Sequence, residues 1–429
     1  MERFTIGDAA ELAGDVGPDP RLIGVLAETA GRVDTERLRA RFAAALVDLP
    51  VLRRRFVQRG RNTLAARWET MDCPVEEHVL ELDLHEPDGH AAEDGVAALR
   101  ACERLYAEGL PEDRPMWRVT VLHGTRRDHL LFLAHHVLLD GTVAQPVLGR
   151  LLTDPVAPGE LPPLPTPAET PGSTAAAPPR RLPLPRLPLG LLAGITHRAS
   201  ASSLLSPISQ GFHLVTLGLP LAEVHDVGHR AGATVNDVLL AMVGMAIRQL
   251  AASRGEHLRR VVMSVPVTRP APLDSQGTRN AVGAFAIAVP ELQPGEASAQ
   301  YLARLAKLTR RRKALVHGFW ATPVFSLGLA ALGGLGLYRP LFERQHAITT
   351  LVTNLRGPAG PLSVDGLRIT SLTPISPALG NVCLVFAALS YAGQLRISVR
   401  LDHSVWPDEA LLVQALEDAW SWLGTNNSL

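Results

Sequence analysis

The sequence predicts an α/β protein built in two halves, and three observations point to this fold class. The chain has 429 residues, 46% of them hydrophobic and 20% charged, so it can bury a large core and is long enough for two domains. Apolar runs typical of strands alternate with segments of helical periodicity in both halves. Between them the composition shifts to proline, alanine, glycine and threonine, which favour neither a helix nor a central strand. We expect an N-terminal lobe at 1–152, a proline-rich linker at 153–205 and a C-terminal lobe at 206–429.

The charge balance argues against a nucleic-acid-binding protein, and the cysteines argue for a reducing compartment. Lysine and arginine together number 42, as do aspartate and glutamate, so the formal net charge is +0 and no positive field favours nucleic acid. Cys73, Cys102 and Cys383 are too far apart for a CxxC unit, and their odd count indicates reduced thiols. The amino terminus contains no apolar core of signal-peptide length. We expect a cytoplasmic protein that does not bind nucleic acid.

Three helices and a hairpin are predicted in the first half. Asp34 can cap a helix over residues 35–49, whose apolar residues share one face and which Pro50 ends. A second helix is expected at 91–108. The segment 116–123 reads as a strand, joined by a charged turn at 124–127 to an apolar strand at 128–134. An apolar segment that follows Gly141 and runs to residue 152 predicts a further helix.

Two adjacent histidines lie where that apolar strand ends. Alternation along a strand would send His135 and His136 to opposite faces, so that only one faces a given pocket. An imidazole on a rigid strand end is suited to take a proton from a hydroxyl or an amine. Asp140 could orient the turn by accepting hydrogen bonds or pairing with an arginine, and Gly141 permits an unusual backbone angle. The alternative is one core histidine and one solvated one; no metal site is expected, because further ligands at suitable spacing are missing.

The second half opens with a predicted strand at 212–217 and a helix from Pro220. Thr234 and Asp237 are spaced almost as a capping box ahead of a long apolar helix, which gives Asn236 and Asp237 a purely structural interpretation. The last helix is expected to begin at Pro407 and to end near Gly424.

An uncharged stretch at 317–338 is long enough to cross a bilayer. Pro323 and four glycines oppose a regular spanning helix, so we interpret the stretch as a buried or partly exposed apolar helix. The basic cluster at 310–313 that precedes it suits peripheral attachment to an anionic surface. Arginines and leucines also alternate at 180–195 of the linker, which either lies against a membrane or covers the protein.

The HHxxxDG pattern of residues 135–141 resembles the active-site motif of the CoA-dependent acyltransferase superfamily, which includes chloramphenicol acetyltransferase and the condensation domains of peptide synthetases. Nearly the whole chain resembles one branch, the wax ester synthase/diacylglycerol acyltransferase family. The similarity is weakest in the first thirty or so residues and in the linker. Besides the histidines, it is carried by Pro115-Met116-Trp117, Asn236-Asp237 after the PLAEV helix, SVPVTRP at 264–270, Gly277 with Asn280, VGAFAIAVP at 282–290, TNLRGPAGPL at 353–362 with Asn354, and the segment from 374 to 408.

This resemblance implies a fold, a reaction and a set of site residues. The implied fold is two similar mixed-sheet lobes with a channel between them, as in chloramphenicol acetyltransferase. The implied reaction transfers an acyl group from acyl-CoA, a co-substrate rather than a cofactor, to a hydroxyl acceptor such as a fatty alcohol or diacylglycerol, with His136 as the base. Asn236 is the candidate oxyanion donor, and Asp237, Asn354 and Arg356 are candidate substrate-binding residues. Arg356 departs from the family pattern and contacts either a ligand or solvent.

Several alternatives stay open at this stage. The donor could be a carrier-protein thioester and the acceptor a hydroxyl or amine of specialised metabolism. A non-catalytic lipid-binding or scaffold protein could retain the same fold. Arginines 53–55 form either a solvated basic turn or a site for the CoA phosphates. The expected location is cytoplasmic, with peripheral attachment to the inner face of the membrane or to a lipid droplet. No GxGxxG, Walker or GxSxG pattern points to a nucleotide-dependent enzyme or a serine hydrolase.

Overall fold

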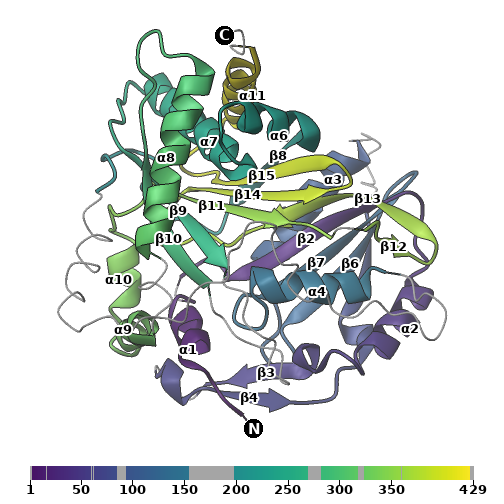
Figure 1. Ribbon diagram of the computed structural model, residues 1–429. Coiled ribbons are helices and arrows are strands. Elements are labelled where there is room, and N and C mark those ends of the chain that lie inside the picture. Colours follow the sequence, from purple (N-terminus) through teal and green to yellow (C-terminus); the bar gives the residue numbers. More distant parts are fainter. Residues whose placement is uncertain are drawn as a thin grey trace, which may run out of the picture.

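Two mixed sheets of six strands each organise the protein (Figure 1). The computed structural model describes residues 2–15, 17–58, 60, 62–84, 93–153, 198–268, 282–316, 323–358 and 360–425. The predicted linker therefore lies almost entirely outside the described residues, as do Gly277 and Asn280.

The first sheet carries strands from both halves of the sequence. Its order is β12 (Ser363–Val364), β13 (Leu367–Ile375), β2 (Leu22–Thr29), β7 (Asp128–His135), β6 (Trp117–His123) and β5 (Val79–Asp83). β5 and β6 are parallel, and the other neighbours are antiparallel. The helices of this half are α1 (Ile6–Ala13), α2 (Thr35–Ala45), α3 (Asp94–Ala107) and α4 (Gly141–Leu151). A small sheet, β1 (Glu2–Arg3), β4 (Arg67–Thr70) and β3 (Arg54–Val57), adjoins them, with 3-10 turns η1 (Pro50–Arg53), η2 (Thr63–Ala65) and η3 (Val75–Glu77).

Both faces of the first sheet are covered, which explains the continuous apolar run along β7. Leu131 and Leu133 pack with residues of α3 on one face. Phe132 and Ala134 pack with α2 and α4 on the other face. A strand covered on both faces needs apolar side chains at every position, so strict alternation is absent. The predicted hairpin of β6 and β7 is confirmed.

The second sheet has helices over one face. Its order is β10 (Val282–Val289), β9 (Val261–Thr268), β11 (Thr350–Arg356), β14 (Leu384–Tyr391), β15 (Gln394–Asp402) and β8 (Phe212–Pro220). β11 is parallel to β9 and β14, and the remaining pairs are antiparallel. Above it in Figure 1 lie α6 (Leu221–Arg230), α7 (Val235–Ser253) and α11 (Glu409–Thr425), and α8 (Ser298–Val316) runs down its left side. α9 (Pro323–Gly334) and α10 (Tyr338–Phe342) lie beside α1 at the lower left.

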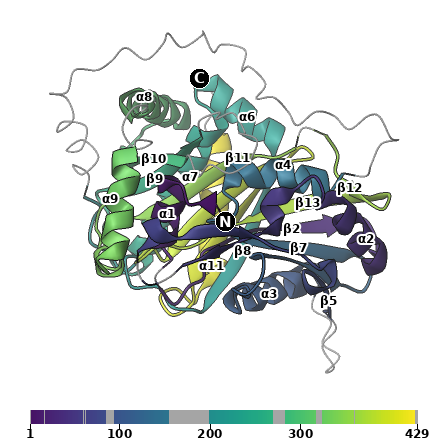
Figure 2. The ribbon, with the colours of Figure 1, turned by 90° about the horizontal axis from the view of Figure 1, so that it is seen from below.

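The two halves interlock instead of meeting at a simple boundary. β12 and β13 follow residue 205 in sequence, yet β13 pairs with β2 and extends the first sheet. In β14 of the second sheet, Tyr391 accepts a hydrogen bond from Leu362 N (2.8 Å) and donates one to Ile369 O (3.2 Å). Asp19, ahead of β2, forms a buried ion pair with Arg400 of β15, whose guanidinium also lies 3.9 Å from the centroid of the Phe212 ring. Figure 2 shows the sheets side by side from below.

Several predicted helices are found with shifted ends. Asp34 caps α2 by accepting from Glu36 N and Arg37 N, but the helix ends at Ala45 and not at residue 49, because a turn and η1 intervene. α11 begins two residues after Pro407. Among the described residues, one helix, α7, is long and apolar enough to cross a membrane, and 67% of its apolar window is buried as core. The stretch 317–338 is not one helix: its described part forms α9 and leads into α10.

Candidate active site

The turn between β7 and α4 holds the two histidines. His135 ends the strand, and its backbone N–H donates to Met116 O at 2.9 Å. His136 N donates to Arg21 O at 2.9 Å, while Leu138 N and Leu139 N both donate to His135 O. The expected alternation does not extend to His136, because the strand has ended and the chain turns. As predicted, the motif lies at a strand-to-helix turn.

His135 is a buried positioning residue. Its Nδ1 accepts a hydrogen bond from Val137 N (3.2 Å), so its proton is on Nε2, which donates to Asp15 Oδ2 at 3.0 Å. The Phe56 ring lies edge-on, with centroids 5.5 Å apart. Burial would raise the pKa of Asp15, but the hydrogen bond from His135 and the nearby Arg21 outweigh it and lower that pKa. His135 therefore ties the catalytic turn to the segment that follows α1.

His136 faces a carboxylate that the sequence did not reveal. Its Nδ1 lies 3.4 Å from Glu11 Oε2 in α1, and the same oxygen accepts from Arg21 Nη2 at 2.9 Å. Burial is the largest influence on the pKa of His136 and lowers it; Glu11 and Asp140 oppose this, and Arg21 and His135 reinforce it. The net pKa lies below its ordinary value, so the imidazole is neutral near pH 7 and has a nitrogen that can accept a proton.

Glu11 stays ionised in this setting. Burial alone would raise its pKa, but His136 and the Arg21 guanidinium outweigh that effect and the pKa of Glu11 is lowered. A carboxylate beside a neutral imidazole stabilises the imidazolium that forms when the base takes a proton. No sequence signal marked Glu11, Asp15 or Arg21, because single charged residues near the amino terminus are common on helix surfaces.

Asp140 occupies the position directly before α4. It is 2% exposed, and its carbonyl accepts from Ala144 N at 2.8 Å, the first turn of the helix. Aspartate is a preferred residue at the start of a helix. Gly141 is the first residue of α4, and the role of the Asp140 side chain in shaping the turn stays a prediction.

Asp237 is held by structural contacts. A full capping box joins it to Thr234, and its Oδ1 accepts from Thr309 Oγ1 of α8 at 2.6 Å. These contacts fix the amino end of α7 against α8, which is the structural interpretation given above. Asn236, in the first turn of α7, is half-buried. Its role as an oxyanion donor stays a prediction.

Residues 354–357 lie beside the helix that follows the histidines. The Gln145 side chain of α4 donates to Arg356 O at the end of β11. Gly357 is required there, since a Cβ would lie 2.2 Å from Ser390 O. Asn354 is half-buried and Arg356 is exposed. This hydrogen bond links the segment of residues 354–357 to α4. Whether Asn354 and Arg356 contact a ligand stays a prediction.

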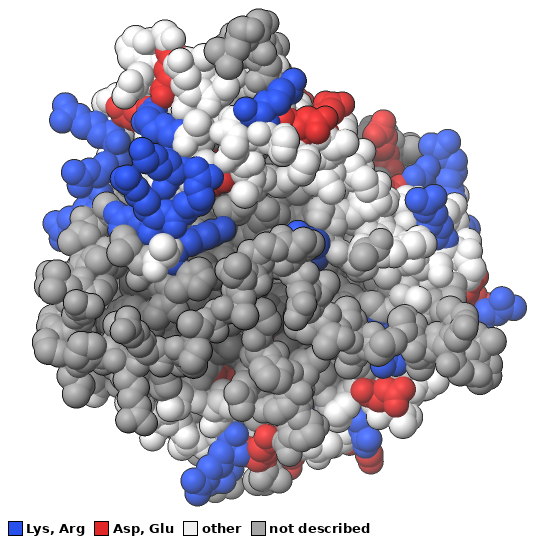
Figure 3. All heavy atoms as spheres, viewed as in Figure 1, with Lys and Arg blue, Asp and Glu red and all other residues white. Residues whose placement is uncertain are grey.

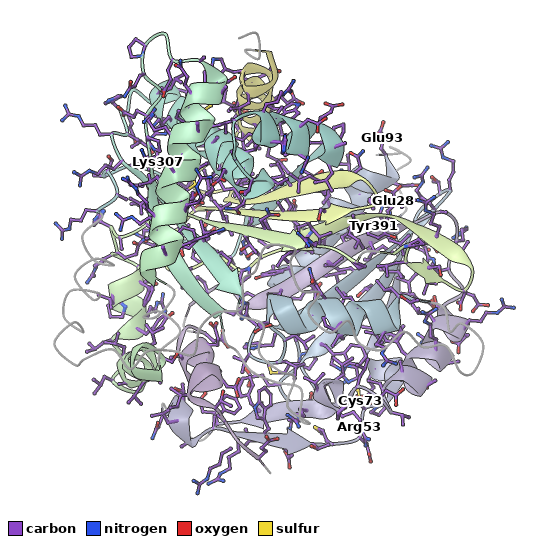
Figure 4. All side chains as sticks on the ribbon, viewed as in Figure 1. Glu28, Arg53, Cys73, Glu93, Lys307 and Tyr391 are labelled. Atoms are coloured by element: carbon purple, nitrogen blue, oxygen red, sulfur yellow. The ribbon has the colours of Figure 1, made fainter. Side chains whose placement is uncertain are left out.

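The three consecutive arginines face carboxylates instead of a free anion site. Arg53 lies 3.6 Å from Asp72, Arg54 3.3 Å from Glu2, and Arg55 2.8 Å from Glu69. Arg54 is buried, so it is not part of a solvated turn. Arg53 is the most exposed of the three and fits that interpretation best. Figure 4 shows Arg53 next to Cys73 near the lower edge of the molecule.

Comparisons with known proteins agree with this architecture. Residues 22–206 match the wax ester synthase/diacylglycerol acyltransferase catalytic domain, and residues 279–423 match the WS/DGAT C-terminal domain. The chain is 28% identical to a probable diacylglycerol O-acyltransferase of Mycobacterium tuberculosis (strain H37Rv), covering 98% of this chain and 95% of that protein. A putative diacylglycerol O-acyltransferase of Mycobacterium bovis has the same identity and coverage.

Solved structures share the fold at lower identity. A wax ester synthase/diacylglycerol acyltransferase from Marinobacter aquaeolei superposes with a TM-score of 0.68 at 20% identity, over 100% of both chains. The first condensation domain of the calcium-dependent antibiotic synthetase gives 0.65 at 18% identity, over 100% of this chain and 98% of that one. At such identities the likeness shows the fold alone. The predicted two-lobed mixed-sheet architecture is confirmed.

Replacing Asp140 tests its structural role. Asp140→Ala should lower the free energy of unfolding by about 1–3 kcal/mol, because a buried carboxylate that shapes a turn is lost. Asp140→Asn, which can still accept at the helix start, should lose less. Urea unfolding of the three proteins measures the difference. Equal stability of parent and Asp140→Ala would remove the structural role.

Replacing Glu11 tests the electrostatics of the histidine. Glu11→Gln should lower the pKa of His136 further, because the charge that favours the imidazolium is gone. An NMR pH titration, with the resonance assigned by its loss in His136→Gln, measures this. Glu409→Gln, which removes a carboxylate facing His213 instead, is the matched control and should leave His136 unchanged. A rise of the His136 pKa in Glu11→Gln would contradict the assigned contact.

Proposed function

The chain belongs to the wax ester synthase/diacylglycerol acyltransferase family, and on that premise we propose that it transfers an acyl group from a CoA thioester to an alcohol, giving an ester. The two domain matches together cover more than half of the chain. The observation that carries the chemistry is the neutral His136 at the turn, with Glu11 beside its Nδ1.

His136 acts as the general base. An alcohol is too weak an acid to ionise beforehand, so its proton leaves as the oxygen attacks the thioester carbonyl. The new C–O bond forms, the C–S bond breaks, and the imidazolium returns the proton to the departing thiolate, so that CoA leaves as the thiol. Because the two substrates meet directly, no covalent acyl-enzyme is required. Glu11 stabilises the transient imidazolium, and Asn236 is the proposed donor to the oxyanion.

The proposed acceptor is a hydrophobic alcohol such as a fatty alcohol or diacylglycerol. The relatives from Mycobacterium are named as diacylglycerol O-acyltransferases, which supports a hydroxyl acceptor. The condensation domains are similar to this chain in fold only, so they do not support an amine acceptor or a carrier-protein donor for it.

The catalytic assignment is tested by replacing each histidine. His136→Ala should lower acyl transfer by at least about a hundredfold without unfolding the protein, because the base is lost. His135→Ala should cost less, since it acts through the position of the turn. The measurement supplies palmitoyl-CoA with hexadecanol or dioleoylglycerol and reads the product mass. Near-normal turnover by folded His136→Ala would overturn the mechanism.

We further propose that the protein is cytoplasmic and attaches reversibly to an anionic lipid surface, where hydrophobic acceptors collect. A basic patch on α8 supports this: Lys307, Arg310, Arg311, Arg312 and Lys313 lie within one helix. Figure 3 shows basic side chains gathered at the upper left, over the part of the molecule where α8 lies, and Figure 4 labels Lys307 there. Clustered basic side chains near a membrane surface are attracted to anionic lipids, and salt screens the attraction.

Vesicle binding tests the basic patch. The protein should co-sediment with vesicles of equal parts phosphatidylcholine and phosphatidylglycerol at low salt and be partly released at high salt. The variant R310Q/R311Q/R312Q should bind less. The control R32Q/R37Q/R126Q removes the same charge from exposed arginines elsewhere and should bind as the parent does. Equal binding by both triple variants would show that the patch has no such role.

A further inference from the structure

Arg21 contacts the catalytic turn in two ways. Its carbonyl accepts a hydrogen bond from His136 N at 2.9 Å, and its Nη2 donates one to Glu11 Oε2, also at 2.9 Å. The same carboxylate oxygen lies 3.4 Å from Nδ1 of His136. The position of Arg21 therefore fixes both the backbone of the histidine and the carboxylate that faces its ring.

Arg21 is the middle residue of a three-residue turn, residues 20–22, which is called the Arg21 turn below. Leu22 N closes this turn by donating to Pro20 O at 2.8 Å. Turns of this kind are common at strand ends, and β2 begins at Leu22. A single hydrogen bond contributes little net stability, so contacts with neighbouring side chains must hold the turn in place.

The hydroxyl of Tyr106 contacts both groups that close the Arg21 turn. It donates to Pro20 O at 2.8 Å and accepts from Leu22 N at 3.3 Å. Tyr106 belongs to α3 and is 0% exposed. Burial raises the pKa of this phenol, and the nearby Asp19 raises it further, so the hydroxyl keeps the proton that it donates. Tyr106 thus braces the Arg21 turn from the first half of the chain.

Arg400, in β15 of the second half, holds the residue that precedes the Arg21 turn. Its guanidinium pairs with Asp19, and both side chains are only 4% exposed. The guanidinium carbon also lies 3.9 Å from the ring centroid of Phe212 and 4.7 Å from that of Tyr106. Figure 2 shows α3 beside β8, the strand that bears Phe212. Stacking on two rings adds to the ion pair and restricts the guanidinium to one arrangement.

We propose that Tyr106 and Arg400 are positioning residues for the base. They hold the Arg21 turn, and the Arg21 turn holds His136 and its partner Glu11. This inference rests on the proposed function and deepens it, because it gives the second half of the chain a part in placing the base. Displacing a catalytic group by about 1 Å can slow a reaction about a hundredfold. A looser Arg21 turn should therefore slow the chemical step without weakening substrate binding.

Removing one hydroxyl tests the brace. Tyr106→Phe should lower kcat for esterification of hexadecanol by palmitoyl-CoA at least about fivefold and leave KM for both substrates unchanged, because only the placement of the base is affected. The amide of His136, which donates to Arg21 O, should exchange its hydrogen at least about fivefold faster, because its acceptor is held less firmly. Steady-state kinetics and NMR-detected hydrogen exchange measure the two effects.

Tyr301→Phe is the matched control for this variant. Tyr301 is also 0% exposed and donates to a proline carbonyl, Pro290 O at 3.0 Å, but it belongs to α8 of the second half. It should leave kcat and His136 exchange as in the parent. Unchanged kcat or unchanged exchange in Tyr106→Phe, or equal changes in the control, would overturn the proposal. If the parent forms no ester, the proposed function fails, and the exchange rates alone decide whether Tyr106 holds the catalytic turn.

A single and a double variant test the ion pair. Arg400→Met leaves Asp19 buried without its cation, so the urea midpoint should fall together with kcat. Adding Asp19→Asn removes the second charge, so the double variant should regain most of the midpoint while its kcat stays at least about fivefold below the parent. Arg400→Lys, which keeps the charge but not the planar stacking, should have an intermediate kcat. A double variant that regains both the midpoint and kcat would show that the pair only compensates charge, which would remove the positioning role of Arg400.

Discussion

The active site depends on two contacts between imidazoles and carboxylates that dock the amino-terminal segment onto the catalytic turn. His135 donates to Asp15, and His136 faces Glu11, which Arg21 holds from the other side. Without the second contact His136 would lose the carboxylate that most favours its charged form, and only the weaker influence of Asp140 would remain in that direction. Burial keeps His136 neutral. In the proposed mechanism the Glu11 carboxylate then stabilises the imidazolium that forms when His136 takes a proton.

The interlocked sheets hold the two halves of the chain together. β13 crosses from the second half into the first sheet, and the buried pair of Asp19 and Arg400 joins the halves. Removing one partner of such a pair leaves an uncompensated charge, so the halves are held in one arrangement. The turn that bears His136 therefore lies among elements whose positions are mutually fixed, as the proposed role of a base that meets two substrates requires.

Local signals in the sequence predicted much of the fold and part of the site. The hairpin of β6 and β7, the cap at Asp34, the capping box at Thr234 and the strand-to-helix turn at His136 all rest on neighbouring residues. The sequence did not predict that Glu11 belongs to the site, because Glu11 contacts His136, which is distant from it in sequence. The crossing of β13 was missed for the same reason, since no local pattern reports which sheet a strand joins. Arg54 was misjudged because charge suggested solvent, whereas its side chain is buried and pairs with the exposed Glu2.

The central claim is that neutral His136 takes the acceptor proton, and the pH dependence of kcat/KM for acyl transfer tests it most directly. Protonation of the free base abolishes its function, so the rate should fall as pH drops through the pKa of His136. Because that pKa is lowered, the midpoint should lie below about 6.5, the ordinary value for histidine. An acyl-pantetheine donor avoids titration of the CoA phosphate. A fall with its midpoint below that value is the predicted result; a rate that does not fall with acidification, or that falls with a midpoint above it, would contradict the account.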